Sequence, residues 1–216
     1  MDRAYLEIIF LCGMVLQLIL LFPYLHKYIA KKYRNYFNKT ERLYLLFIGI
    51  GYQLLPFIYV FSTWFSWFDY NLPKFLSFLA IALYCFGFWL FFRAFTDLGL
   101  SWSAGPDIKE GHRLVTSGMY KWVRHPIYAA FCTIAVAQIF MLQNWMVGPA
   151  FLLLAIPFYR YRVSREEQHL RNHFGEEYQE YCKNTNALFP RMDLIDYSWI
   201  MNRLKILIQT RKRKLK

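Results

Sequence analysis

Charged residues are scarce in this chain. Only 19% of its 216 residues are charged, whereas 57% are hydrophobic and 21% are aromatic. Soluble domains usually have about a quarter charged residues and about half apolar residues. This shortage of charge argues against a soluble protein, and it indicates a membrane protein with one domain.

Cysteine gives no sign of a disulfide framework or a metal site. Three of the four cysteines lie inside apolar runs, and none forms the CxxC pair that metal sites often use. We therefore expect all four to be buried small apolar side chains. They are Cys12, Cys85, Cys132 and Cys182.

Five apolar runs are long enough to be considered as membrane spans. A helix needs about 20 apolar residues to cross a bilayer core of roughly 30 Å. The first run follows MDRAYLE, whose two acids, with no small-residue cleavage site after the run, predict a retained span and not a signal peptide. We expect an all-α, multi-pass membrane bundle of about five transmembrane helices. Their expected ranges are about Ala4–Leu25, Leu43–Phe61, Lys74–Phe92, Ile127–Leu142 and Trp145–Tyr161.

Two residue patterns add detail to this bundle. Pro56 predicts a kink in the second span, because proline removes a helix hydrogen bond. Only Gln143 and Asn144 separate the last two spans, which predicts a tight helical hairpin. The chain is then organised in three parts. They are three N-terminal transmembrane helices over 1–96, a region over 97–191 that contains the hairpin, and a basic tail over 192–216.

Acidic residues are few beside basic ones, 14 against 26, which gives a net charge of +12. The Lys and Arg residues lie in loops 26–42 and 93–125 and after the fifth span, whereas the other side holds only Arg3 and Lys74. The positive-inside rule then places the N-terminus outside and the C-terminus in the cytosol. A basic surface of this kind suits anionic membrane lipids. No nucleic-acid recognition motif is visible, so nucleic acid is not an expected partner.

Two further features concern the membrane. The Lys-, Phe- and Tyr-rich usage is typical of an AT-rich genome, and we expect a prokaryotic plasma membrane before an endoplasmic reticulum. The tail has apolar residues at mixed three- and four-residue spacings before its basic end, which favours a helix lying in the interface. A solvated tail would also fit. The apolar residues are Leu194, Ile195, Trp199, Ile200, Leu204 and Leu207.

Two cytosolic segments are rich in functional side chains, and the hairpin brings them together. They read GHRLVTSGMYKWVRHPIY over 111–128 and RYRVSREEQHLRNHFGEEYQEY over 160–181. In the second segment, Arg162 and Glu166 are four residues apart and share one face of a helix. By spacing alone, the ordinary interpretation is a surface ion pair of little energetic value. The functional interpretation is that Arg162 binds an anionic group of a substrate, while Glu166 beside it binds a cation or a hydroxyl of a cofactor.

In the first segment, His125 and Pro126 begin a span. Proline suits the first helical turn, where free N–H groups and the helix dipole favour an anionic group. Tyr120 and Tyr128 add aromatic faces and hydroxyls. His112 and His125 taken singly are ordinary interfacial histidines, and no third ligand has suitable spacing for a metal site.

Taken together, the motifs HRLVTSGMY, RHPIY, EE and HFGEEYQEY resemble the isoprenylcysteine carboxyl methyltransferase family of integral-membrane enzymes. The resemblance covers roughly 97–191, while the first three spans match only in hydropathy. It implies an S-adenosylmethionine-dependent methyltransferase, similar to protein-S-isoprenylcysteine O-methyltransferases, with the cofactor bound on the cytosolic side. It also implies a lateral opening that admits a lipophilic substrate from the bilayer, and it makes 97–191 the catalytic region.

The resemblance also assigns residues. Arg162 would hold the carboxylate of the substrate, and Arg124 and Glu167 match the motif as further catalytic candidates. The implied cofactor pocket comprises His112, Arg113, Leu114, Val115, Tyr120, His125, Pro126, Ile127, Tyr128 and Glu166.

Elementary chemistry agrees with this assignment. A carboxylate such as Glu166 suits the ammonium or ribose diol of the cofactor, and aromatic faces attract its sulfonium. A carboxylate acceptor is ionised near neutral pH and needs no general base, so alignment and exclusion of water would provide the catalysis. Arg162 could align such a headgroup bidentately.

Other functions stay open at this point. Methylation of a phospholipid amine or a small thiol would need a base, for which His112, His125 or Glu167 would serve. An NADPH-dependent sterol reductase shares an element like RHPIY, but this chain lacks the asparagine often found there. A membrane scaffold would leave the joint occurrence of the two motifs unexplained.

Overall fold

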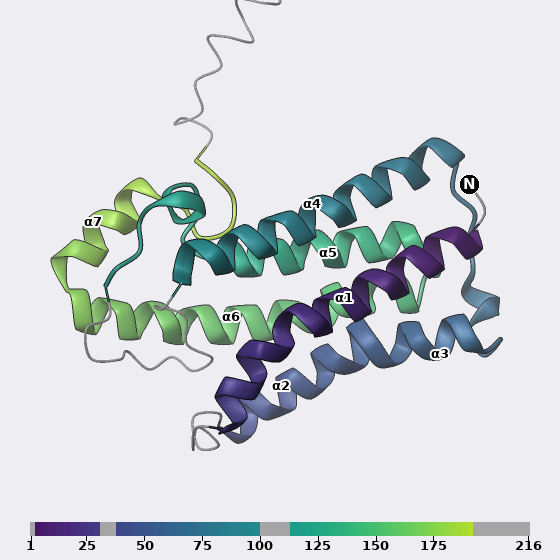
Figure 1. The fold of residues 1–216 in the computed structure, drawn as a ribbon, viewed down its shortest axis with the longest axis horizontal. Coiled ribbons are helices and arrows are strands. Elements are labelled where there is room, and N and C mark those ends of the chain that lie inside the picture. Colours follow the sequence, from purple (N-terminus) through teal and green to yellow (C-terminus); the bar gives the residue numbers. More distant parts are fainter. Residues whose placement is uncertain (1–2, 31–37, 100–112, 192–216) are drawn as a thin grey trace, which may run out of the picture.

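The computed structural model describes residues 3–30, 38–99 and 113–191, and within these ranges it is helical without a β-strand. Figure 1 shows long helices lying beside one another, with the N-terminus at one end and the shorter helix α7 at the other. The all-α prediction is confirmed. In chain order, the elements are α1 (Arg3–Ala30), α2 (Lys39–Gly49), η2 (Ile50–Leu54), α3 (Leu55–Phe61), η3 (Ser66–Phe68), α4 (Lys74–Leu98), η5 (Gly118–Lys121), α5 (Pro126–Leu142), α6 (Val147–Phe174) and α7 (Glu176–Asn184).

Three stretches are long and apolar enough to cross a membrane, namely 3–20, 39–61 and 74–98. Helix α5 is apolar but shorter. Helix α6 is apolar only in its first half and then continues as a polar helix to Phe174. The expected bundle of about five spans therefore matches α1, the combined α2–α3 segment, α4, α5 and the first half of α6. The proposed interfacial tail lies outside the residues that the structure describes.

The bundle buries aromatic residues inside and exposes apolar ones outside. Phe10, Tyr84 and Phe151 are almost fully buried in the central cluster, whereas Phe75 and Phe78 on α4 are well exposed. An apolar exterior is the surface that a protein presents to lipid. Cys12 and Cys85 lie on this exterior. The prediction that all four cysteines are buried is therefore wrong, because an apolar side chain in a membrane helix can face lipid as well as the core.

Helices α4 and α5 approach closely at Gly87. A β-carbon there would lie 2.7 Å from Cγ1 of Ile134, so a larger residue would push the two helices apart. Small residues at helix contacts are a common device in membrane bundles. This contact holds the middle of α5, the helix that begins beside the functional residues, close against α4.

The second span contains an irregular turn next to Pro56, where a kink is predicted. A π-helical turn, η2, precedes the proline, which lies in the first turn of α3. The backbone carbonyl of Gly51 in this turn accepts a hydrogen bond of 3.1 Å from Nε2 of Gln138 on α5. A side chain from a neighbouring helix thus satisfies a backbone group that the irregular turn leaves exposed inside the bundle.

The turn between α5 and α6 is longer than expected. Helix α5 ends at Leu142 and α6 begins at Val147, so Trp145 lies in the turn and not in the fifth span. The cause is Asn144, whose Oδ1 accepts hydrogen bonds from the backbone N–H groups of Met146 at 3.0 Å and Val147 at 2.9 Å. An asparagine side chain that accepts hydrogen bonds from the backbone two and three residues further on stabilises a turn, and α6 follows this turn at Val147.

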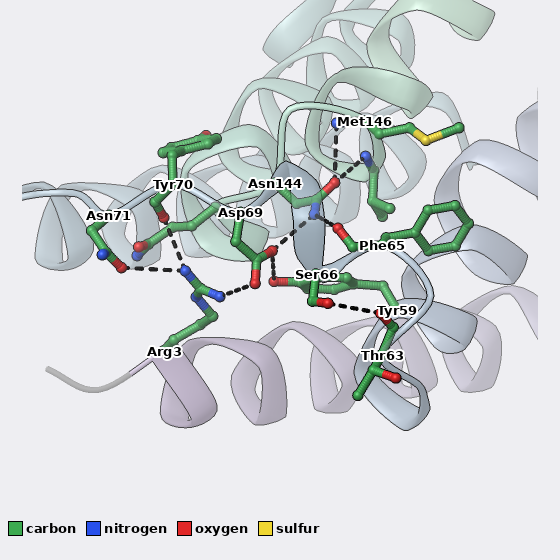
Figure 2. A network of polar contacts seen from close by, with 12 residues as sticks. Arg3, Tyr59, Thr63, Phe65, Ser66, Asp69, Tyr70, Asn71, Asn144 and Met146 are labelled. Carbon is green, nitrogen blue, oxygen red and sulfur yellow. Dashed lines mark hydrogen bonds and ion pairs between the residues drawn. The ribbon is translucent and has the colours of Figure 1, made fainter.

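A polar network ties this turn to the N-terminus, as Figure 2 shows. Nδ2 of Asn144 donates to Oδ1 of Asp69 at 2.8 Å and to the carbonyl of Phe65 at 2.8 Å. Arg3 forms an ion pair with Asp69, and Tyr59 donates a hydrogen bond of 2.9 Å to the same carboxylate. The network fixes α1, α3, the 62–73 loop and the hairpin at one end of the bundle.

Candidate functional site

The predicted polar segments converge at the other end of the bundle, beside α7 (Figure 1). The first is anchored to α4 by Asp97, whose Oδ2 accepts a hydrogen bond of 2.8 Å from the backbone N–H of Met119. Gly118 adopts a φ of 61°, and a β-carbon there would lie 2.4 Å from the same carboxylate. Glycine is therefore needed at this turn, and it fixes the approach of η5 to α4.

Helix α7 returns the chain to this segment. The backbone N–H groups of Arg124 and His125 donate to the carbonyls of Asn186 and Ala187, both at 2.9 Å. The hydroxyl of Tyr181 donates to the carbonyl of Tyr120 at 2.5 Å. These contacts position the residues immediately before α5 against the end of α7.

Glu167 is the centre of one cluster. Its Oε1 accepts hydrogen bonds from Nε of Arg124 at 3.1 Å and from Nη2 of Arg124 at 2.8 Å. Nε2 of His125 lies 3.3 Å from the same oxygen, and Nη2 of Arg171 lies 3.5 Å from Oε2. Arg124 also donates to the carbonyl of Thr185. Arg124 therefore links α6 to the end of α7.

Glu166 is the centre of a second cluster. Its Oε1 accepts hydrogen bonds from the hydroxyl of Tyr128 at 2.9 Å and from Nε of Arg162 at 2.7 Å. Its Oε2 lies 3.8 Å from Nδ1 of His125. His125, which is buried, thus stands between two carboxylates and approaches each with a different ring nitrogen. The tautomer decides which nitrogen donates.

Arg162 is not part of a surface ion pair. Its side chain is 4% exposed, and its Nη1 donates at 3.1 Å to Oε1 of Glu41, which is fully buried. The ordinary interpretation of the spacing between Arg162 and Glu166 is therefore wrong. The spacing shows that the two share a helix face, but only the packing of α2 against α6 covers that face.

Sequence reasoning missed Glu41 altogether. The segment NKTE over 38–41 has the pattern of a capping box, and Asn38 and Glu41 form one at the start of α2. This signal predicts where a helix begins. It does not indicate that the carboxylate would reach two arginines of α6, Arg162 and Arg165.

The structure brings together six of the predicted residues: Arg124, His125, Tyr128, Arg162, Glu166 and Glu167. Tyr120 is buried in η5 close to them, and Pro126 is buried at the first position of α5, as predicted. Ile127 packs against the apolar cluster around Phe91.

Four other predicted pocket residues precede η5. Arg113 is exposed, and Leu114 and Val115 are half-buried in the irregular segment that leads into η5. His112 lies outside the residues that the structure describes. The cofactor-binding roles of all these residues stay predictions.

The surroundings keep the cluster charged. Burial raises the pKa of Glu167, but hydrogen bonds from His125 and Arg124 outweigh this effect and hold the pKa at about 2. Burial lowers the pKa of Arg124, yet Glu167 reverses this and raises it above its usual value. Burial raises the pKa of Tyr120, which therefore remains a neutral phenol. Glu167 is thus a fixed anion that holds Arg124 and His125.

Glu166 offers the better site for a ligand. It is 22% exposed, and its Oε1 holds Tyr128 and Arg162 while its Oε2 faces His125 at a longer distance. An ionised carboxylate oxygen accepts more than one hydrogen bond, so Oε2 can receive a cationic or hydroxyl donor. Within the described ranges, no group of three or more His, Cys, Asp or Glu side chains is arranged to hold a metal ion.

These features define a helical membrane protein with a buried polar site at one end of its bundle. Residues 80–172 match the sequence model of the isoprenylcysteine carboxyl methyltransferase (ICMT) family. The resemblance predicted from the motifs is therefore confirmed, and this segment, which runs from α4 to the polar half of α6, is related to that family.

Curated relatives agree. The chain is 32% identical over 113 residues to the protein-S-isoprenylcysteine O-methyltransferase of Schizosaccharomyces pombe. The aligned segment covers 51% of this chain and 48% of that protein. It is 40% identical over 79 residues to the Homo sapiens protein of the same name. Here the aligned segment covers 37% of this chain and 28% of that protein. The chain thus matches less than half the length of each.

A solved structure supports the fold. It is described as the eukaryotic intramembrane Ras methyltransferase ICMT (isoprenylcysteine carboxyl methyltransferase), and it matches with a TM-score of 0.50 and 22% identity. The match covers 71% of this chain and 54% of that chain. At this identity, the likeness concerns the arrangement of the membrane helices.

The low pKa of Glu167 predicts a pH dependence of stability. A group with a depressed pKa in the folded state stabilises the fold above its unfolded pKa of about 4.5, and this contribution is lost as the pH falls towards about 2. Its full size is about 3 kcal/mol. We expect Glu167→Gln to lower the unfolding temperature in detergent at pH 7, and the difference from the wild type to shrink as the pH falls from 5 to 3.

The control is Glu177→Gln, because Glu177 is exposed on α7. This variant should follow the wild type at every pH. A difference between Glu167→Gln and the wild type that does not change with pH would contradict the assignment of Glu167 as a fixed anion.

Proposed function

We propose that this chain is an integral-membrane methyltransferase that moves a methyl group from S-adenosylmethionine to a lipophilic acceptor. The preferred acceptor is the carboxylate of an isoprenylcysteine-like substrate. The observation that carries the proposal is a set of two buried residues, Arg162 and His125, in contact with two half-buried ones, Glu166 and Tyr128, at the end of a membrane bundle. All four lie within the segment that matches the methyltransferase family.

The donor set fits the proposed cofactor. S-adenosylmethionine supplies an electrophilic methyl group on a sulfonium, next to an ammonium, a carboxylate and a ribose diol. Oε2 of Glu166 would accept hydrogen bonds from the ammonium or the diol. The ring centroids of Tyr128 and His125 are 5.8 Å apart, and these aromatic rings would attract the positively charged sulfonium. The first turn of α5, which begins at Pro126, presents free backbone N–H groups to a carboxylate. Residues 112–115 would complete the pocket.

Arg162 would hold the carboxylate of the acceptor. Its guanidinium is already oriented by Glu41 and Glu166, so the incoming carboxylate would join this ion-pair cluster or take the place of Glu166 on Nε. A carboxylate is ionised at neutral pH and attacks without losing a proton. The protein's part is then to align the two reactants and to exclude water.

The runner-up is methylation of an amine or a thiol, which needs a base. His125 is the candidate base, because its ring nitrogens lie 3.8 Å from Glu166 and 3.3 Å from Glu167, which would orient the imidazole. Glu167 does not favour this alternative, because a carboxylate with a pKa of about 2 is a poor base near neutral pH. The proteins that this chain resembles are named as carboxyl methyltransferases, and a sterol reductase has no such support.

We further propose that the N-terminus faces outside and that the site faces the cytosol, in a prokaryotic plasma membrane. The location of Lys and Arg supports this orientation. In a variant without native cysteines, we expect Trp67→Cys in η3 to react with a membrane-impermeant thiol reagent on intact cells. Lys183→Cys on α7 should react only after lysis. Both positions are exposed, and the opposite pattern would reverse the orientation.

Cofactor binding tests the pocket. We expect Glu166→Ala to weaken binding of S-adenosylmethionine by at least about tenfold, because a charge-assisted hydrogen bond contributes roughly 1.5–3 kcal/mol. Titration calorimetry on the purified protein in detergent measures this. Glu177→Ala is the control and should bind as the wild type does. An unchanged affinity in Glu166→Ala would remove Glu166 from the pocket.

Acceptor choice tests the reaction. Labelled S-adenosylmethionine is offered with a prenylcysteine, with phosphatidylethanolamine and with a small thiol, and we expect methyl transfer to the prenylcysteine. Arg162→Lys keeps the charge but loses the planar fork, so it should lower kcat/KM for this acceptor by about ten- to a hundredfold. The exposed Arg160→Lys on the same helix is the control. Transfer to the amine or thiol alone would favour the runner-up.

A further inference from the structure

We propose that Glu41 is a positioning residue for the acceptor, because it fixes the guanidinium of Arg162 from outside the predicted cofactor pocket. This inference rests on the proposed function. It assigns a role to the N-terminal part of the chain, since Glu41 lies on α2 and outside the segment 80–172 that matches the family.

One oxygen of the Glu41 carboxylate joins α2 to α6, and the other caps α2 itself. Its Oε1 accepts hydrogen bonds from Nη1 of Arg162 and from Nη1 of Arg165, both at 3.1 Å. Its Oε2 accepts a hydrogen bond of 3.1 Å from the backbone N–H of Asn38. The side chain is fully buried. A buried carboxylate that accepts hydrogen bonds from two guanidiniums is held in one orientation. If it rotated away, both the carboxylate and the guanidiniums would be left as unpaired charges in a poorly hydrated site.

Helix capping alone does not account for this arrangement. A capping box satisfies backbone groups at a helix start, and glutamine serves at its third position as well as glutamate does. It requires neither burial nor contacts with another helix. Glu41 has both, and Asn38 strengthens the same junction by donating a hydrogen bond of 2.7 Å to the hydroxyl of Tyr161 on α6.

Arg162 is held from two sides. Nη1 meets Glu41 on α2, and Nε meets Glu166 one turn along α6 at 2.7 Å. Two anchors on different helices fix both the position and the plane of a guanidinium. Glu166 is also the proposed cofactor ligand, so its position depends on the pocket. Glu41 provides the anchor that stays in place while the pocket fills.

The test compares Glu41→Gln with the wild type. Glutamine has nearly the same size and retains the capping hydrogen bond from Asn38, but it removes the charge that holds Arg162 and Arg165. We expect kcat/KM for the prenylcysteine acceptor to fall at least about tenfold, while the affinity for S-adenosylmethionine stays within twofold. A kcat/KM within twofold of the wild type would overturn the proposal.

A matched control separates positioning from capping. Asn38→Ala removes the cap and the contact with Tyr161, but it leaves the Glu41 carboxylate in place. We expect this variant to unfold at a lower temperature with unchanged acceptor kinetics. If it reproduces the kinetic defect of Glu41→Gln, helix capping explains the defect and the proposal fails. Where Glu41→Gln does not fold, the double variant Glu41→Gln with Arg165→Gln restores the charge balance and undergoes the same measurements.

A readout that does not depend on activity completes the test. With ¹⁵N-labelled arginine in detergent micelles, we follow the Nη–H groups of Arg162, because Nη1 is the nitrogen that donates to Glu41. They are assigned by their loss in Arg162→Lys, and we expect them to exchange at least about tenfold faster in Glu41→Gln than in the wild type. Unchanged exchange would overturn the proposal. A wild type that transfers no methyl group would overturn the proposed function, and the exchange rate would still decide whether Glu41 holds Arg162.

Discussion

The arrangement of this site depends on one constraint, which is that an ionised group removed from water must find a partner of opposite charge. Glu41 is fully buried and Arg162 nearly so, and each is paired with the other. Glu167 meets the same requirement through Arg124 and His125. Because these partners come from α2, α6 and the residues before α5, pairing the charges also fixes the position of the helices that carry them.

The opposite end of the bundle follows the same rule with a different outcome. Asp69 is paired with Arg3 and receives hydrogen bonds from Tyr59 and Asn144 (Figure 2). There the polar groups join the hairpin turn to the N-terminus and to the 62–73 loop. At the end that carries the proposed site, Oε2 of Glu166 can accept a further hydrogen bond, for example from a ligand. A network with only a structural role would not need this additional acceptor.

A site of this kind suits a reaction between a water-soluble cofactor and a membrane-dissolved acceptor. The exterior of the bundle is apolar, whereas the polar half of α6 carries Arg162 and Glu166 just beyond its apolar half. An acceptor with a lipid tail and a carboxylate would therefore reach the arginine without leaving the bilayer. The charges required for alignment are also the charges that hold α2 against α6, so stability and the proposed function depend on the same contacts.

The sequence by itself determined the helical class, the approximate spans and the convergence of the two polar segments, because hydropathy and a short hairpin are local properties of the chain. It also indicated the resemblance through motifs at fixed spacing. The tertiary structure alone decided that Arg162 is buried and that Glu41 pairs with it, since 121 residues separate them and no local pattern links them. It also decided that Asn144 delays the start of α6 and that two cysteines face outwards, because these outcomes depend on which helices and loops become neighbours.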